Sequence, residues 1–415
     1  MRGRLGALRR LNETYRTLGW LCLVVCTNQL GFGLIVPIVP QFARSFGVSQ
    51  ALAGLVISVY GLGRLLFDLP MGGLTERFGR RSVIIAGEII TAVGSFLCGS
   101  ADSFGQLVFY RFIAGVGAAT VLTGAQVVLA DISTPENRPV LMNTYQGLFL
   151  AAVGIGPSVG GIVADTFGIR APFFGFAVLS LAAAGVCLWR VPETRHRARD
   201  RARLAGTTAV PPMPFAEALR LLLRRRGFLL IGLVSFTQFA ARTGALFNVV
   251  PLMGAARLGL SASAVGVAIS VASLMNLATI PLSTIIMRRY GRKGAIVPSA
   301  LVCGLAFATF AVAYEYPVFL LATAMWGLGG GVGGAAPGAY AADMAPRGAN
   351  GATMGAYATL ADAGYVLGPF LLGLLADVAG FGAALFSIAA LFVVVAALFA
   401  LYAPETVRGT RQATA

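Results

Sequence analysis

The sequence is poor in charge, and several kinds of chemistry are absent from it. Only 12% of its 415 residues are charged, about half the share in an ordinary soluble domain. Histidine occurs once, at His196, so we expect no relay of histidine side chains. The five cysteines are scattered singly, with neither a zinc-type spacing nor a loop pair. No metal site, nucleotide-binding loop or convergent catalytic set is apparent, so we expect no cofactor and no enzyme.

Apolar residues dominate instead, at 57% of the chain. They gather in runs about as long as the ~20 residues that a helix needs to cross a bilayer. Long unbroken runs exclude the alternating pattern of a membrane β-barrel. The sequence therefore predicts an all-α membrane protein with twelve transmembrane helices, at about residues 17–40, 50–72, 82–100, 105–130, 139–164, 171–190, 227–252, 262–287, 294–313, 317–342, 351–376 and 382–403.

The net charge of +16 raises the question of a nucleic-acid partner. However, most of the 32 basic residues fall in the hydrophilic segments on one predicted side of the membrane. The positive-inside rule then predicts a multi-pass protein of the cell membrane with both termini in the cytoplasm. We expect lipid and no nucleic acid around it. The N-terminal stretch up to Trp20 lacks a cleavage site after a short apolar core, so we expect it to be retained rather than removed as a signal peptide.

An internal repeat occurs at one constant offset in residue number, the offset that leads from Asp131 to Asp343. Glycine matches alone would be weak, but acidic pairs and a whole triplet recur as well. The recurring residues are Asp131 with Asp343, Asp165 with Asp377, and Pro192, Glu193, Thr194 with Pro404, Glu405, Thr406. The repeat predicts two pseudo-symmetric six-helix bundles, residues 1–190 and 227–415, with a small-molecule site near the bilayer midplane.

The segment between the predicted bundles, residues 191–226, reads as a basic cytoplasmic linker. Its end places Phe215, Leu219, Leu222 and Leu223 on one helical face. That pattern predicts a short helix lying on the membrane surface.

The stretch GGLTERFGRR after the second predicted helix resembles the loop signature of the major facilitator superfamily. The resemblance implies that this loop is a conformational latch that steadies the outward-open state. The alternative is a plain basic loop that only sets topology. The family usually has Asp at the acidic position, and in the second half Arg288 replaces the acid, so we expect the C-terminal copy to lack the latch. The latch residues would be Gly72, Glu76, Arg77, Gly79, Arg80 and Arg81, with Gly79 in a left-handed turn.

The resemblance to this family extends over most of the chain, and two further stretches carry it. YRFIAGVGAA is similar to a signature whose membrane arginine is tied to proton coupling. This would be Arg111, which we expect to face a cavity or a carboxylate; the alternative role is a structural ion pair. GIGPSVGG resembles the signature of antiporters, although Ala152 stands where the family has a glycine. Its residues, which favour export over uptake, are Gly154, Gly156, Pro157, Gly160 and Gly161.

Acids within the predicted helices are few, which narrows the search for a proton carrier. Asp68 is one candidate. It lies one turn after Arg64, so the alternative to proton coupling is that the two charges neutralise each other. Asp362 lies at a depth comparable to that of Arg242, so it is either a proton or substrate site or part of a static ion pair. Glu88 is at the depth of Asp68, but on a helix that is usually peripheral in this fold. The proton-coupling candidates are Asp362, Arg111, Asp68 and Glu88.

The expected function is proton-coupled secondary transport by alternating access, as an antiporter that exports drug-like or secondary-metabolite molecules. The alternative is a proton-coupled uptake symporter for a sugar or organic acid. We expect a monomer whose partners are protons and a small-molecule substrate. Polar residues expected to face the central cavity, or alternatively to join helices by hydrogen bonds, are Asn28, Gln29, Gln126, Asn143, Gln146, Gln238, Arg242, Asn248, Tyr357 and Tyr365.

Overall fold

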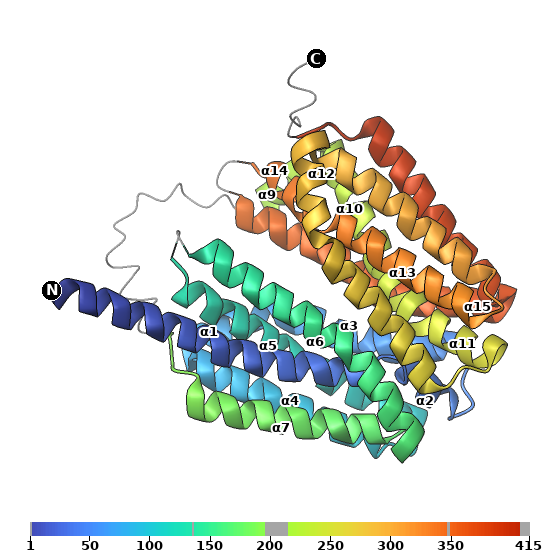
Figure 1. Ribbon diagram of the computed structural model, residues 1–415, viewed down its shortest axis with the longest axis horizontal. Helices are drawn as coiled ribbons and strands as arrows, with labels where there is room; N and C mark the ends of the chain where they lie inside the picture. The colour runs from blue at the N-terminus through green and yellow to red at the C-terminus, as the bar shows by residue number, and fades with distance from the viewer. Residues whose placement is uncertain (1, 135–136, 196–214, 347–348, 407–415) are drawn as a thin grey trace. The chain divides into compact units, whose positions relative to one another are not determined.

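The computed structural model describes the chain except for residues 1, 135–136, 196–214, 347–348 and 407–415. The side chains of residues 2–12, 69, 72, 76, 139, 215–216 and 350 also lie outside the description. Every regular element in the described part of the chain is a helix (Figure 1). The elements are α1 (Arg2–Ile35), α2 (Val39–Arg44), α3 (Gln50–Phe78), α4 (Arg80–Gly99), α5 (Phe104–Ile132), α6 (Arg138–Phe167), α7 (Ala171–Arg190), α9 (Phe215–Leu223), α10 (Arg226–Ala240), the π-helix η1 (Ala241–Val249), α11 (Val250–Leu258), α12 (Ala262–Ala311), α13 (Tyr316–Gly333), α14 (Ala336–Asp343) and α15 (Asn350–Tyr402).

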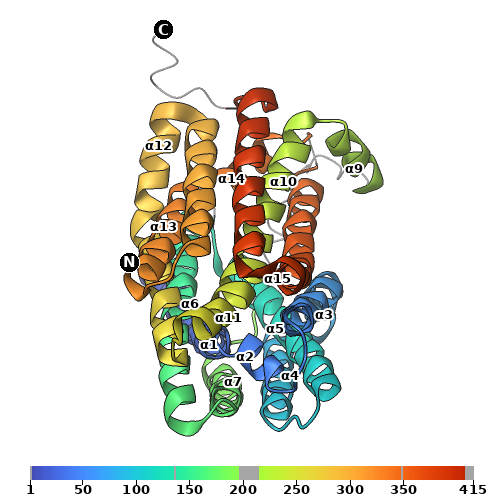
Figure 2. The same ribbon diagram turned by 90° about the vertical axis from the view of Figure 1, so that its right-hand side faces the viewer.

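Ten helical stretches among the described residues are long and apolar enough to cross a membrane. Two of them, α12 and α15, run for 50 and 53 residues, too long for one crossing. Each breaks once, at Gly291 (φ 80°) and at Gly380 (φ 84°), where the backbone adopts a conformation that glycine reaches readily. Figure 2 shows α12 as two helices joined at a sharp turn. The all-α membrane fold is confirmed, and the two breaks make it consistent with twelve crossings.

The internal repeat is visible in the backbone as well as in the sequence. Gly79 (φ 95°) corresponds, at the offset of the repeat, to Gly291 (φ 80°). Gly168 (φ 92°) corresponds at the same offset to Gly380 (φ 84°). The two halves therefore end and restart their helices at equivalent positions, although α12 and α15 continue where the first half has separate helices.

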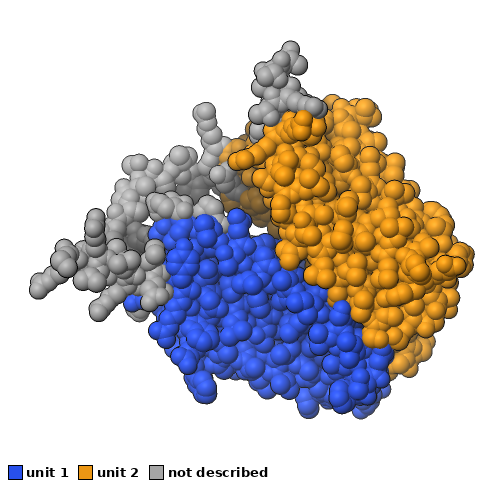
Figure 3. Space-filling model, viewed as in Figure 1, with its two compact units in different colours: residues 1–38, 59–207 blue, residues 39–58, 208–415 orange. Residues whose placement is uncertain are grey.

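The chain divides into two compact units (Figure 3). Unit 1 comprises residues 1–38 and 59–207, and unit 2 comprises residues 39–58 and 208–415. Residues 39–58 pack in unit 2 because Asp377 of α15 accepts hydrogen bonds from the backbone N–H groups of Gln50 (2.9 Å) and Ala51 (2.8 Å) at the start of α3. A carboxylate is favourable at a helix N-terminus. The predicted division into residues 1–190, 191–226 and 227–415 follows the repeat and stays a prediction.

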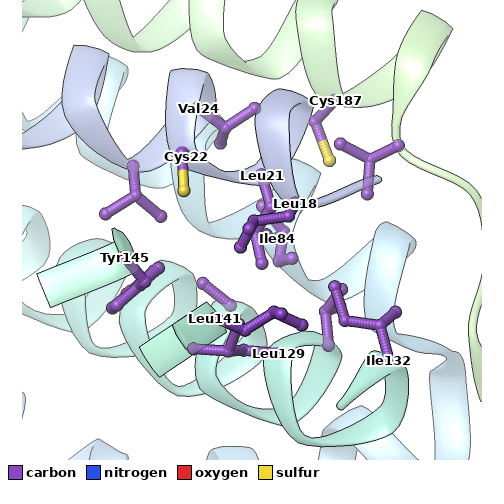
Figure 4. Packing of buried hydrophobic residues seen from close by; sticks show 14 of the residues in the cluster. Leu18, Leu21, Cys22, Val24, Ile84, Leu129, Ile132, Leu141, Tyr145 and Cys187 are labelled. Carbon is purple, nitrogen blue, oxygen red and sulfur yellow. The ribbon is translucent and has the colours of Figure 1, made fainter. Parts of the chain in front are cut away.

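Unit 1 has an apolar core in which five helices take part (Figure 4). Leu21 of α1, Ile84 of α4, Leu129 of α5, Leu141 of α6 and Cys187 of α7 are all buried in one cluster. A corresponding cluster in unit 2 includes side chains of α10, α12, α14 and α15. Large apolar side chains are also exposed on the outside of both units, which is what a lipid environment requires.

The helix predicted at the end of the linker is present as α9. Its Leu222 is fully buried and packs with Phe228 and Ala356, whereas Leu223 is 49% exposed. The apolar face of α9 is therefore partly covered by α10 and α15 of unit 2.

Candidate functional site

A buried carboxylate lies among three helices of unit 1. Glu88 of α4 is fully buried, and its Oε2 accepts a hydrogen bond from Nδ2 of Asn28 on α1 (3.0 Å). Nε2 of Gln29 donates in turn to Oδ1 of Asn28 (3.2 Å). Both amide residues, predicted to face a cavity, are 5% exposed or less. The sequence pattern named all three residues but did not pair them.

The second oxygen of Glu88 is buried without a hydrogen-bond partner, although a hydroxyl lies near the carboxyl. This hydroxyl belongs to Ser180 of α7. Within the described residues, neither Oε1 of Glu88 nor Oγ of Ser180 has a hydrogen-bond partner, and no cation pairs with Glu88. A buried charge without a counter-ion is costly in a membrane. A proton on Oε1 would make this carboxyl neutral and give it an O–H donor, and the Ser180 hydroxyl near the carboxyl is an unused acceptor.

Arg111 of α5 lies against an aromatic ring. It is 2% exposed, and its guanidinium carbon lies 4.3 Å from the ring centroid of Tyr60 on α3. Tyr60 stacks in turn on Phe32 of α1 at 5.5 Å. In the part of the chain that the structure describes, no acidic side chain pairs with Arg111. A cation–π contact partly compensates for its burial, and the expectation that it faces a cavity stays a prediction.

Asp68 of α3 is half-buried and accepts a hydrogen bond from Oγ1 of Thr123 on α5 (3.3 Å). Arg64, one turn earlier on α3, interacts electrostatically with it. The predicted neutralisation between Arg64 and Asp68 is therefore part of the arrangement, which sets Asp68 apart from Glu88.

In unit 2, the π-helix η1 is joined to α15 by polar contacts. Oγ1 of Thr243 donates to the carbonyl of Tyr365 (3.1 Å), and Nδ2 of Asn248 donates to the carbonyl of Pro369 (3.1 Å). Asn248 thus joins two helices by a hydrogen bond, which was the alternative to its facing the central cavity. Single π-helical turns often mark functional positions, and no pattern in the sequence indicated this one.

The remaining candidates of unit 2 lie on α10, η1 and α15. Arg242 and Asp362 are half-buried, with the guanidinium of Arg242 5.5 Å from the ring centroid of Phe247. Tyr365 is buried, and Gln238 is half-buried. Tyr357 packs in the clusters beside α10. The unit 1 candidates Gln126, Asn143 and Gln146 are exposed.

The glycines of the predicted antiporter motif bring α6 into backbone contact with α1. A Cβ atom on Gly160 would overlap the carbonyl oxygen of Leu34, and one on Gly156 would lie 2.5 Å from Cα of Gly33. Pro157 and the neighbouring Gly154 and Gly161 are buried. No residue larger than glycine fits at the two contact positions without moving a helix.

At the start of α4, a charge network ties three segments of unit 1 together. Nε of Arg80 donates to Oδ2 of Asp131 (2.9 Å), which also accepts from Oγ1 of Thr194 (2.7 Å). The carboxylate of Glu193 accepts from the backbone N–H groups of Arg80 (3.0 Å) and Arg81 (3.1 Å), capping the first turn of α4.

The same four bonds recur in unit 2 at the offset of the repeat. Arg292 donates to Asp343 (3.3 Å), Thr406 donates to Asp343 (2.7 Å), and Glu405 accepts from the backbone N–H groups of Arg292 and Lys293 (3.0 Å each). The repeated Asp and Pro-Glu-Thr residues were the signal for this network. The expectation that the C-terminal copy lacks the latch, because Arg288 replaces the acid, stays a prediction.

The other predicted latch residues differ in burial and in backbone conformation. Arg77 is exposed, with its guanidinium 5.4 Å from the ring centroid of Phe78. Gly79 has φ 95° but ψ 151°, so it is not in the left-handed helical turn that we expected. Arg81 is half-buried. Gly72 and Glu76 lie outside the described side chains.

A comparison with known families decides what kind of protein this is. The model of the Major Facilitator Superfamily matches residues 21–361 and 240–415. The chain belongs to this superfamily. Its members are membrane transporters and not enzymes.

This superfamily member is similar to several known proteins. Multidrug resistance protein 2 of Bacillus subtilis (strain 168) is 30% identical over 165 residues, which cover 40% of this chain and 41% of that protein. The quinolone resistance protein NorA of Staphylococcus aureus (strain Mu50 / ATCC 700699) is 27% identical over 155 residues, which cover 37% of this chain and 39% of NorA. The matches thus span less than half the length of these curated relatives. Among solved structures, that of a D-xylose-proton symporter has a TM-score of 0.72 at 17% identity, covering 94% of this chain and 98% of the symporter.

In this superfamily member, the two copies of the charge network should differ in strength. The Arg80 and Asp131 side chains are 7% and 9% exposed, whereas those of Arg292 and Asp343 are 24% and 29% exposed. Because removing one partner of a buried pair leaves an uncompensated charge, we expect Asp131→Asn to cost about 3 kcal/mol and Asp343→Asn about 1 kcal/mol. Thermal unfolding of both variants in detergent measures this. Equal losses would contradict the difference in burial.

Proposed function

We propose that this chain is a proton-driven antiporter that exports drug-like molecules by alternating access. Its similarity to multidrug and quinolone resistance proteins supports export of such compounds. The glycine contacts between α1 and α6, at the residues that resemble the antiporter signature, support the same direction of transport. We also propose that the protein works as a monomer in the cell membrane, with both termini in the cytoplasm, as the basic residues predict.

The observation that carries the proposal is the buried carboxyl of Glu88. Ionised and dry, it has a hydrogen bond from Asn28 but no counter-ion among the described residues. Protonated, it is neutral and gains an O–H donor near the hydroxyl of Ser180. Water reaching this position would stabilise the ionised form, so proton release is linked to the opening of the surrounding helices.

The helix α1 connects the carboxyl to the antiporter motif. Asn28, bonded to Glu88, and Gly33, in contact with α6, are both on α1 and little more than one turn apart. A change in the Asn28 hydrogen bond on protonation therefore acts on the helix that packs on Gly156. Asp362, beside the π-helix of unit 2, remains the second proposed proton or substrate site.

Reconstitution in liposomes with an imposed pH step tests the proposed function. A pH-sensitive dye is enclosed, and a panel of quinolones and apolar cations is added outside. We expect a compound to collapse the pH gradient while moving opposite to protons, and one pH unit to support about a tenfold compound gradient per proton. Compound and proton moving in the same direction would favour the uptake symporter. Facilitated diffusion without any proton flux would remove proton coupling altogether.

A further inference from the structure

A surface cavity of about 450 Å³ lies beside the charge network of unit 1, where α4 begins and α7 ends. Its wall includes Arg81 of α4, Leu188 of α7, and Glu193 and Arg195 just after α7. The volume lies within the range of small-ligand sites. All of the lining residues belong to unit 1.

Two guanidinium groups of this cavity keep donors unused. Nε of Arg81 and Nε of Arg195 are both buried without a hydrogen-bond partner. Nη1 of Arg195 donates to the carbonyl of Arg77 (3.1 Å). The side chain of Arg81 makes no hydrogen bond or ion pair in the part of the chain that the structure describes. A buried guanidinium donor without an acceptor is unfavourable until an anion supplies one.

The third charged group of the wall does not neutralise the arginines directly. Oε1 of Glu193 accepts from the backbone N–H groups of Arg80 and Arg195, and Oε2 accepts from that of Arg81. Its carboxylate is therefore committed to the backbone at the start of α4.

At the equivalent position of unit 2, the side-chain cation does have hydrogen-bond acceptors. Lys293, which corresponds to Arg81 in the repeat, donates from Nζ to the carbonyls of Ala400 and Ala403, both at 2.8 Å, near the end of α15. Arg81 makes no such bonds to α7. In unit 2 the cation therefore bonds to the end of the last helix, which we call the closed copy. In unit 1 the equivalent cation has no such bonds and lines the cavity, which we call the open copy.

Two apolar lining residues of this cavity, and the tryptophan next to one of them in the chain, are exposed. Phe78 is 56% exposed, Leu188 is 48% exposed, and Trp189 is 83% exposed. Tryptophan and arginine at a helix end are typical of the boundary between lipid tails and headgroups. An anion reaching Arg81 from this side would bring apolar chains against these residues.

We propose that this cavity binds the phosphate of an anionic phospholipid, with Arg81 and Arg195 as the phosphate ligands and Phe78 and Leu188 against the acyl chains. The phosphate oxygens accept from the unused guanidinium donors. Because both arginines are positively charged, we expect the cavity to bind a lipid with a net negative headgroup more tightly than a zwitterionic lipid. Binding here would stabilise the junction between the start of α4 and the end of α7.

Native mass spectrometry of the full chain in mild detergent tests the proposal, with phosphatidylglycerol and phosphatidylcholine as probes. We expect retained phosphatidylglycerol to exceed phosphatidylcholine. The double variant Arg81→Gln/Arg195→Gln should reduce it on the order of tenfold. Leu188→Trp, which fills the cavity but keeps both charges, should reduce it as well. Arg224→Gln removes an exposed cation elsewhere and should leave retention unchanged.

Three outcomes would overturn the proposal. Equal retention of phosphatidylglycerol by the wild type and by both cavity variants would place the lipid elsewhere. Equal retention of the two lipids by the wild type would show that the cavity does not select charge. If inorganic phosphate or glycerol 3-phosphate displaced all of the bound phosphatidylglycerol, the acyl chains would contribute nothing to binding. The ligand would then be a soluble anion.

Discussion

Glu88→Gln is expected to reduce proton-driven transport strongly while the protein remains folded. Glutamine keeps the size of the side chain and a carbonyl oxygen for the hydrogen bond from Asn28, but it cannot take up or release a proton. Coupled transport should fall on the order of 10²-fold, the lower range for loss of a proton-transfer group. Dye-detected proton flux in liposomes, with compound present, measures the loss. Thermal unfolding should be close to that of the wild type.

Matched variants separate this role from a general effect of removing charge. Glu217→Gln removes a carboxylate from the exposed surface of α9 and should leave coupled flux unchanged. Asp362→Asn tests the second proposed site. Coupled flux at the wild-type rate in Glu88→Gln, together with its loss in Asp362→Asn, would move proton coupling from unit 1 to unit 2.

The sequence predicts the scaffold well because its signals are local. Apolar runs give the crossings, and a fixed spacing gives the repeat. The breaks at Gly291 and Gly380 lie between predicted helices. A signature such as GIGPSVGG is read within one helix, and its glycines do form the close contact with α1.

Partnerships across helices are harder to predict. Asn28 and Glu88 are 60 residues apart, and nothing in either helix specifies which residue of the other lies opposite. The energetics of a membrane cation predict a cavity or a carboxylate near Arg111, but no signal in the sequence indicates that the ring of Tyr60 lies against it. The π-helix at 241–249 shifts which side chains face α15, and that shift has no pattern in the sequence.

Gly160→Ala is expected to impair both folding and transport, because it acts on the contact between α1 and α6. The new Cβ would overlap the carbonyl oxygen of Leu34, a backbone atom that cannot rotate away, so the helices must separate. We expect a loss of about 2–3 kcal/mol in stability, the range for overpacking. A strong decrease in coupled flux should accompany it, since α1 also carries the hydrogen bond to Glu88.

The matched control for this variant lies on the same helix. Gly147 of α6 has no atom within 4 Å of an added Cβ, so Gly147→Ala should change stability by less than about 1 kcal/mol and leave transport intact. Both variants make the same chemical change, and only the proximity of α1 differs. Unfolding temperature and coupled flux are measured for the pair. If Gly160→Ala were as stable and as active as Gly147→Ala, α1 and α6 would not be in backbone contact in the working protein, and α1 could not connect Glu88 to the antiporter motif.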